Sequence, residues 1–190
     1  MIEVKNLAYT IDNKTIFSHL SFTIHKGEKK LLLGKNGGGK SSLLGILQGF
    51  LFPTEGKIIR PKEFKSTYLF QDSLHQFIAP IVVEDVAFSL IAKENYSQEN
   101  ARKKAGEMLE KLEIPHLSQD SIFSLSGGER RLVALAGVLV CECDLYLLDE
   151  PFNELDQRRC EIVKKMIEEK SGACLVASHQ SLDWKNQLEL

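Results

Sequence analysis

The chain has 190 residues, of which 43% are hydrophobic and 26% are charged. This composition is typical of one globular domain with its own core, and it argues against disorder. With 24 basic and 26 acidic residues, the net charge is −2, so no overall field attracts the chain to nucleic acid or to an anionic membrane.

Short apolar runs alternate with helical stretches from about residue 30 onward, which indicates an α/β fold with a mostly parallel sheet. A helix is expected over Ser41–Phe50, directly after a glycine cluster, and another over 130–140. The two strands nearest the N-terminus precede the alternating part. The expected strands are Ile2–Val4, Phe17–Ile24, Lys30–Leu33, Thr67–Phe70, Leu145–Leu148 and Cys174–Ala177.

The middle of the chain favours helices alone. Val82–Ala92 and Ser97–Leu112 carry apolar residues close to a helical period, and no strand candidate interrupts 80–120. We therefore expect a single domain over 1–190, in which a helical subdomain of about 80–120 is inserted into an α/β core formed by 1–79 and 121–190.

A glycine-rich segment between a strand and a helix matches the pattern G-x-x-x-x-G-K-[ST]. Such a loop directs several backbone N–H groups at a polyphosphate, and the following helix adds its positive N-terminus. The lysine then neutralises the β- and γ-phosphates, and Ser41 offers a hydroxyl to Mg²⁺. A glycine turn without function is the alternative, but the flanking strand and helix favour a nucleotide. The expected binding residues are Gly34, Lys35, Asn36, Gly37, Gly38, Gly39, Lys40, Ser41 and Ser42.

Two carboxylates end the apolar strand Leu145–Leu148. Ligands of parallel sheets sit at the carboxyl ends of strands, so Asp149 is placed to hold Mg²⁺ and Glu150 to polarise an attacking water. The alternative is a strand end whose charges simply meet solvent.

Leu125-Ser126-Gly127-Gly128-Glu129 precedes the helical run 130–140. With it, the chain resembles the nucleotide-binding domains of ABC ATPases: the segment matches the LSGGQ signature, with Glu129 in place of glutamine. Further matches in the same order are Gln71 to the Q-loop, Asn153–Asp156 to the D-loop and His179 to the switch histidine. The resemblance implies catalytic roles for Glu150, Gln71 and His179, and Mg²⁺ ligation by Ser41, Gln71 and Asp149.

The signature also has a physical interpretation, because Ser126, Gly127 and Gly128 lie at a helix N-terminus and form a second anion site. The resemblance implies that two chains pair head to tail. Each ATP then lies between Lys40 of one chain and Ser126 of the other, with Glu129 and Asp156 also at the nucleotide. ATP binding closes this dimer and hydrolysis opens it.

A finer resemblance involves Tyr68–Asp72, Gln76-Phe77 and Val83–Phe88. These segments are similar to the ATPases of energy-coupling-factor transporters, which import cobalt, nickel and vitamins. The implied protein is a cytoplasmic ATPase held at the inner face of the membrane by a separate integral membrane permease, with a second ATPase subunit and no nucleic acid as partner.

Two other functions are open to such a chain. A non-transport ABC ATPase of DNA maintenance, translation or iron–sulfur assembly is the first alternative, and a small-molecule kinase of the phosphate-loop class is the second. No sustained heptads occur between Gln71 and Ser124, which argues against the long coiled coil of chromosome-maintenance ATPases.

The chain departs from the family pattern at several positions. The adenine-stacking aromatic falls at Ile11, and Tyr9, on the same face of the strand, is the candidate to replace it. Leu74 and His75 replace acidic residues, and Leu132 stands where a basic residue is usual. The chain also ends soon after His179, so we expect one edge of the core to be less covered.

Four cysteines occupy the C-terminal half, and the gap between Cys141 and Cys143 does not suit a zinc knuckle. We expect small, buried or half-buried thiols. The N-terminus has no secretory pattern, and the most apolar segment, 132–143, is too short to span a membrane. These features favour a cytoplasmic protein with reduced cysteines.

Overall fold

The computed structural model describes residues 1–179 and 183–190. These residues form two compact units, which are described in turn. The first unit comprises 1–68, 143–150 and 170–190, and the second comprises 69–142 and 151–169.

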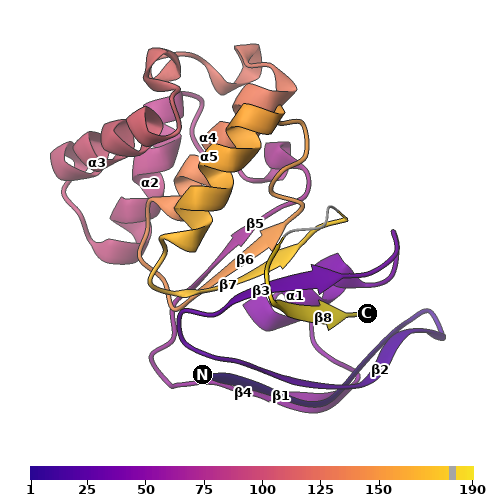
Figure 1. The fold of residues 1–190 in the computed structure, drawn as a ribbon. Coiled ribbons are helices and arrows are strands. Elements are labelled where there is room, and N and C mark those ends of the chain that lie inside the picture. Colours follow the sequence, from indigo (N-terminus) through magenta and orange to yellow (C-terminus); the bar gives the residue numbers. More distant parts are fainter. Residues whose placement is uncertain (180–182) are drawn as a thin grey trace. The chain divides into compact units, whose positions relative to one another are not determined.

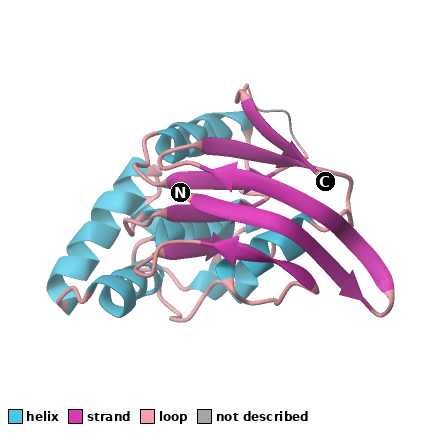
Figure 2. Ribbon diagram, turned by 90° about the horizontal axis from the view of Figure 1, so that it is seen from below, coloured by secondary structure: helices cyan, strands magenta, loops and turns pink. Residues whose placement is uncertain are grey.

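The first unit contains a three-stranded antiparallel sheet in the order β2-β1-β4. Its strands are β1 (Ile2–Ile11), β2 (Lys14–Ile24) and β4 (Glu55–Ile59). A tight turn joins the long strands β1 and β2 (Figure 2), and its two residues, Asp12 and Asn13, have φ values of 47° and 63°. Asp and Asn tolerate this left-handed region and are favoured in two-residue hairpin turns.

A second sheet has the order β5-β6-β7-β3-β8. Its strands are β3 (Lys29–Leu33), β5 (Ser66–Leu69), β6 (Leu145–Asp149), β7 (Ala173–Ala177) and β8 (Asn186–Glu189). The pairs β3–β7, β3–β8 and β6–β7 are parallel. Every residue of β6 and β7 is buried, which is why these strands are continuous apolar runs in the sequence.

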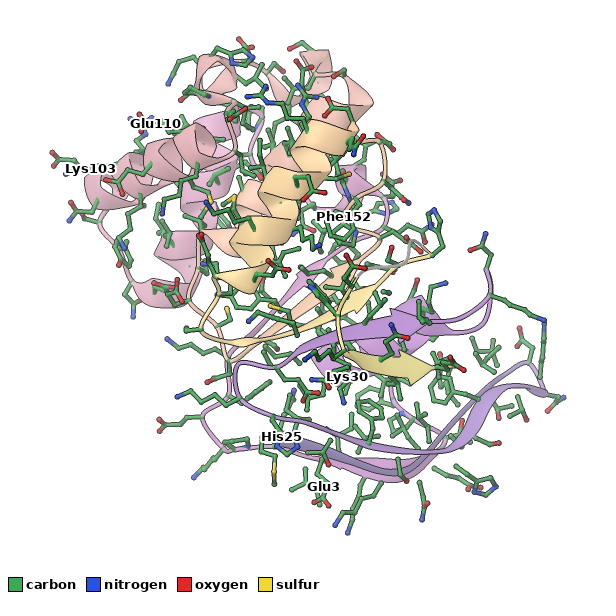
Figure 3. The ribbon with its side chains drawn as sticks, viewed as in Figure 1. Glu3, His25, Lys30, Lys103, Glu110 and Phe152 are labelled. Atoms are coloured by element: carbon green, nitrogen blue, oxygen red, sulfur yellow. The ribbon has the colours of Figure 1, made fainter. Side chains whose placement is uncertain are left out.

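Helix α1 (Lys40–Gln48) follows β3 and lies between the two sheets of the first unit (Figure 1). It ends at Gln48, two residues before the predicted end at Phe50, and the C-cap residue Gly49 has a φ of 94°. The Lys30 side chain also lies between the sheets (Figure 3): its Nζ donates to the Thr23 carbonyl at 2.9 Å and pairs with Glu28 at 3.1 Å.

The second unit contains four α-helices: α2 (Val82–Glu94), α3 (Gln98–Lys111), α4 (Gly127–Leu139) and α5 (Gln157–Glu168). Short 3-10 turns occur at Ser73–His75 (η1), Pro115–Leu117 (η2) and Ile122–Ser124 (η3). Helix α2 packs against α3 and α4. On α3, Ala101 and Leu109 are buried, while Lys103 and Glu110 point outward (Figure 3).

The predicted α/β class, with a mostly parallel sheet, N-terminal antiparallel strands and helices in the middle of the chain, is confirmed. The second unit includes the expected helical segment 80–120 together with α4 and α5.

Two strands were not predicted. β4 and β8 consist mostly of exposed residues, so neither leaves an apolar run in the sequence. We expected one edge of the core to be less covered after His179, and the structure places β8 beside β3 at that edge of the sheet.

The four cysteines are free thiols: Cys141, Cys143 and Cys174 are buried and Cys160 is partly buried, as predicted. Burial raises the pKa of the Cys174 thiol to about 11. Within the described part of the chain, no helix is both long enough and apolar enough to cross a membrane.

Candidate functional site

The glycine-rich loop connects β3 to α1 in the first unit. Gly39 has a φ of 93°, and a Cβ at this position would lie only 2.5 Å from Cγ2 of Ile16 on β2. Glycine is therefore required for both backbone conformation and space. Within the loop, the Gly38 N–H donates to the Lys35 carbonyl at 2.9 Å.

Lys40 begins α1, and its side chain folds back over the loop. It is 7% exposed, and its Nζ donates to the carbonyls of Gly34 at 2.9 Å and Lys35 at 3.4 Å. The first turn of α1 contains no acidic residue, so the positive helix end and the ammonium group are both available to an anion. This arrangement fits the phosphates of a nucleotide.

Asp149 ends β6 and is 2% exposed. The Tyr68 hydroxyl on β5 donates to Asp149 Oδ2 at 3.4 Å. Burial, and secondarily the Asp149 charge, raises the pKa of Tyr68 well above its ordinary value, which keeps the hydroxyl a neutral donor. Tyr68 had no predicted role in the site, and the sequence signal for one is its place near the end of the predicted strand Thr67–Phe70.

Glu150 follows directly and is 6% exposed. Its backbone has a φ of 50°, and its N–H donates to the Ala177 carbonyl at the end of β7 at 2.8 Å. Its Oε2 lies 2.9 Å from His179 Nδ1 and accepts the His179 N–H at 3.3 Å. Its Oε1 lies 3.9 Å from Lys40 Nζ. The structure thus brings Lys40, Glu150 and His179 together.

The oxygen donors near the loop suit a hard cation. Among the described residues there is no cluster of three or more His, Cys, Asp or Glu side chains that could hold a metal ion. Mg²⁺ is commonly bound through one or two carboxylates together with substrate phosphates. Asp149 and the Ser41 hydroxyl, at the start of α1, fit this type of site; Gln71, the third predicted ligand, belongs to the second unit.

The two candidates for adenine stacking lie on β1. The Tyr9 ring is partly buried and its centroid lies 6.1 Å from that of Phe17. Ile11 is 43% exposed at the end of the strand. Tyr9 thus retains part of its aromatic surface for a ligand.

In the second unit, Ser126 caps the N-terminus of α4. The Ser126 N–H and Oγ donate to Glu129 Oε2 at 2.8 and 2.6 Å, and the Glu129 N–H donates back to Ser126 Oγ. This is a capping box. The hydrogen bonds from Ser126 lower the pKa of Glu129, so a carboxylate charge stands in the first turn of α4.

The segment 153–156 packs against this helix end. A Cβ at Gly128 would lie 2.7 Å from the backbone carbonyl oxygen of Glu154, which makes glycine necessary there. Glu154 itself has a φ of 65°, and Asp156 caps α5 by accepting the Arg159 N–H at 2.8 Å. The structure therefore brings together Ser126–Glu129 and Asp156, as the signature and the D-loop of the predicted site.

Gln71 lies in the second unit, between β5 and η1, and is exposed. Its carbonyl accepts a hydrogen bond from Arg131 of α4 at 3.2 Å. Arg131 was not predicted as a site residue; a basic residue was noted as missing at the neighbouring Leu132.

Comparison with known proteins agrees with this geometry. The family model described as "ABC transporter" matches residues 17–153. An uncharacterized ABC transporter ATP-binding protein of Haemophilus influenzae is 36% identical over 94% of this chain and 88% of its own length. The energy-coupling factor transporter ATP-binding protein EcfA2 of Methanospirillum hungatei is 33% identical over 89% of this chain, which spans 46% of that protein.

Solved structures show the same fold. CbiO1 of Clostridium perfringens, part of the ABC transporter complex cbiONQ, has a TM-score of 0.77 and 28% identity over 94% of this chain and 78% of that one. The ATP-binding cassette MJ0796, in a dimeric post-hydrolysis state with ADP and Pi, has a TM-score of 0.83 and 26% identity over 95% of this chain and 88% of that one.

The chain belongs to the ABC transporter ATP-binding family. It has the fold of an ABC-type ATPase, and ATP binding and hydrolysis are its activity. The predictions of family, fold and enzyme class are confirmed.

Proposed function

We propose that the chain is the ATP-hydrolysing subunit of a transporter and works as a head-to-tail dimer that drives a separate membrane permease. The observation that carries this proposal is the presence of two surfaces on one chain that offer backbone N–H groups at a helix N-terminus, which suits an anion. One is the loop Gly34–Ser41 with Glu150 and His179, and the other is the Ser126 end of α4. A homodimer of such chains is sufficient to complete two sites.

In the proposed site, the loop N–H groups and Lys40 bind the phosphates of ATP. Lys40 exchanges its contacts with the loop carbonyls for contacts with phosphate oxygens, which neutralises charge where it develops during transfer. When bound, Mg²⁺ would be held by Ser41 and Asp149 of the first unit and would neutralise further charge on the phosphates.

Glu150 is the proposed general base. Its Oε2 is engaged by His179, which fixes the orientation of the carboxylate. Its Oε1 is the proposed acceptor of a proton from the water that attacks the γ-phosphorus, and ADP and phosphate are the products. His179 is proposed to hold Glu150 in this orientation.

A dimeric state is supported by a solved relative. The MJ0796 cassette is dimeric in its structure with ADP and Pi. In this chain, Gly127 and Gly128 at the start of α4 offer backbone N–H groups to an anion, whereas the Ser126 N–H donates to Glu129 Oε2. We propose that this anion is the nucleotide held by Lys40 of the facing subunit, with Ser126, Glu129 and Asp156 beside it.

The permease partner and the imported substrate are inferred from the energy-coupling-factor resemblance. EcfA2 is named as an energy-coupling factor transporter protein, and CbiO1 is part of a transporter complex. We propose that this chain likewise acts on the cytoplasmic side of the membrane, held there by the permease, and that the imported substrate is a metal ion or a vitamin.

The proposed contact with the permease is the segment Gln71–Phe88. Leu74 is 55% exposed and Ile78 is 69% exposed, whereas Val82 is fully buried. Exposed apolar side chains in a loop-rich segment are the anchors that helix-in-groove recognition needs, so Leu74 and Ile78 support docking of a permease helix. The alternative, that the segment only packs the helical part of the chain, explains Val82 but not these two residues.

Leu74→Glu and Ile78→Glu are expected to abolish co-purification with the membrane subunit while ATP binding stays intact. Both side chains are exposed, so the free energy of unfolding should change by about 0.5 kcal/mol or less. The measurements are affinity co-purification of the tagged chain with its membrane subunit and a melting curve for each variant.

Ile59→Glu on β4 is the matched control, since Ile59 is also apolar and 43% exposed and lies outside the proposed contact. It should co-purify like the wild type. Normal co-purification of both Leu74→Glu and Ile78→Glu would reject this docking surface, and co-purification with a nucleic acid or ribosomal partner instead would favour a non-transport ATPase.

A further inference from the structure

Arg131 is an arginine buried inside the second unit. It is 1% exposed and lies on α4, between one and two turns after the capping residue Ser126. Burial of a guanidinium costs free energy unless hydrogen bonds satisfy its N–H groups. The partners of Arg131 therefore indicate its role.

Hydrogen bonds from Arg131 reach the segment that contains Gln71. Its Nη1 donates to the carbonyls of Phe70 at 2.6 Å and Gln71 at 3.2 Å, and to Ser73 Oγ at 3.3 Å. The Phe70 N–H donates to Gln76 Oε1 at 3.2 Å. Side chains, rather than a strand ladder, therefore hold the backbone after β5.

The far end of this segment is anchored separately. Asp85 of α2 is 7% exposed, and its Oδ1 accepts the N–H groups of Ile78 at 2.6 Å and Ala79 at 2.9 Å. The near end, with Gln71, is thus tied to α4 by Arg131, and the far end is tied to α2. The Arg131 contact leads directly to the helix that begins at Ser126.

We propose that Arg131 is a positioning residue that ties the Gln71 segment to the helix carrying Ser126. Nucleotide contact at Gln71, which belongs to one site of the dimer, then shifts the α4 N-terminus, which serves the facing site. This inference rests on the proposed head-to-tail function. In this proposal, the Arg131 side chain couples the two sites of the dimer through the second unit.

Arg131→Lys and Arg131→Met test the inference in the full chain. Lysine keeps the charge but has a single nitrogen on a differently shaped stem, and methionine has no donor. With ATP and Mg²⁺, we expect KM to stay within about twofold, because Lys40 and its loop are untouched. The kcat should fall about tenfold or more for methionine, with partial recovery for lysine, as expected when a charged hydrogen bond is lost.

Arg130→Met is the matched control. Arg130 is the neighbouring residue of α4, and its Nη1 also donates to a backbone carbonyl, that of Leu125. It makes no recorded contact with the Gln71 segment. If loss of any arginine–carbonyl bond on α4 lowered kcat equally, the control would match Arg131→Met and the inference would be overturned.

Hydrogen exchange separates positioning from simple structural support. It is measured on amides 70–76 and 127–131, with and without ATP and Mg²⁺, at a concentration where light scattering gives a monomer. In the wild type both groups of amides should change on ATP addition. In Arg131→Lys only amides 70–76 should change, whereas a residue that merely fills the core would leave the ATP-dependent change at 127–131 in place.

Ser73→Ala keeps the test decisive if Arg131→Met does not fold. It removes one of the three acceptors and should lower kcat about two- to threefold. If folded Arg131→Lys and Ser73→Ala variants kept the wild-type kcat and the wild-type exchange at 127–131, the inference would be overturned and the proposed function would stand. A wild-type chain that neither hydrolyses ATP nor shows an ATP-dependent change would contradict the proposed function, and the inference with it.

Discussion

Glu150→Gln is expected to lower ATP turnover by about 10²-fold or more, which is the typical contribution of a general base. Glutamine keeps the size of the side chain and can keep a hydrogen bond to His179, so the local structure should persist. It removes the charge that orients the attacking water and accepts its proton. ATP affinity should remain close to that of the wild type. Phosphate release and equilibrium ATP binding are the two measurements.

Glu28→Gln is the control for this prediction. Glu28 is also a largely buried carboxylate of the first unit, paired with Lys30 at 3.1 Å, but it is not part of the proposed site. Its substitution should leave the kcat unchanged in the folded protein. Near wild-type turnover in Glu150→Gln would remove Glu150 from the role of general base.

Lys40→Ala and Ser126→Arg are expected to abolish ATP hydrolysis for different reasons. Lys40→Ala removes a charged contact with phosphate, worth about 1.5–3 kcal/mol, and should weaken ATP binding by the chain about 10- to 10²-fold. Ser126→Arg should leave ATP binding by the monomer within about twofold, because it blocks only the surface that meets the facing subunit's nucleotide. Titration calorimetry and a phosphate-release assay distinguish the two variants.

Mixing the two inactive variants is the decisive form of this experiment. In a mixed dimer, one site combines the intact Lys40 of one chain with the intact Ser126 of the other, so part of the activity should return. The mixed sample would stay inactive if both residues served the same site within one chain. A loss of monomer ATP binding in Ser126→Arg would likewise show that the two surfaces are not separate.

The parts of the fold that leave a local signal in the sequence, such as a run of apolar residues or a glycine cluster, could be predicted. β3, β6 and β7 are short apolar runs because both of their faces are covered. The glycine loop was predictable because only glycine fits the φ of 93° and the close approach at Gly39. β4 and β8 were missed because they are mostly exposed, and their pairing with β1 and β3 is decided by partners far away in the chain.

The residues of the candidate site also divide into those with a local sequence signal and those that depend on distant partners. Lys40 and Glu150 follow from motifs, whereas the contact of Glu150 with His179 joins residues 29 positions apart and was expected only from the family resemblance. Arg131 is the last of three consecutive charged residues at the start of α4 and looks like a surface residue in the sequence. Its burial and its bonds to the Gln71 segment depend on tertiary packing, which no periodicity in the helix encodes.

The central claim is that ATP holds two chains together until it is hydrolysed. It is tested most directly by the mass of Glu150→Gln in solution, measured by size-exclusion chromatography with light scattering in Mg²⁺ with ATP and, separately, with ADP. The account predicts the 21.4 kDa monomer with ADP and twice that mass with ATP. A monomer in both nucleotides, or a dimer that persists unchanged in ADP, would contradict it.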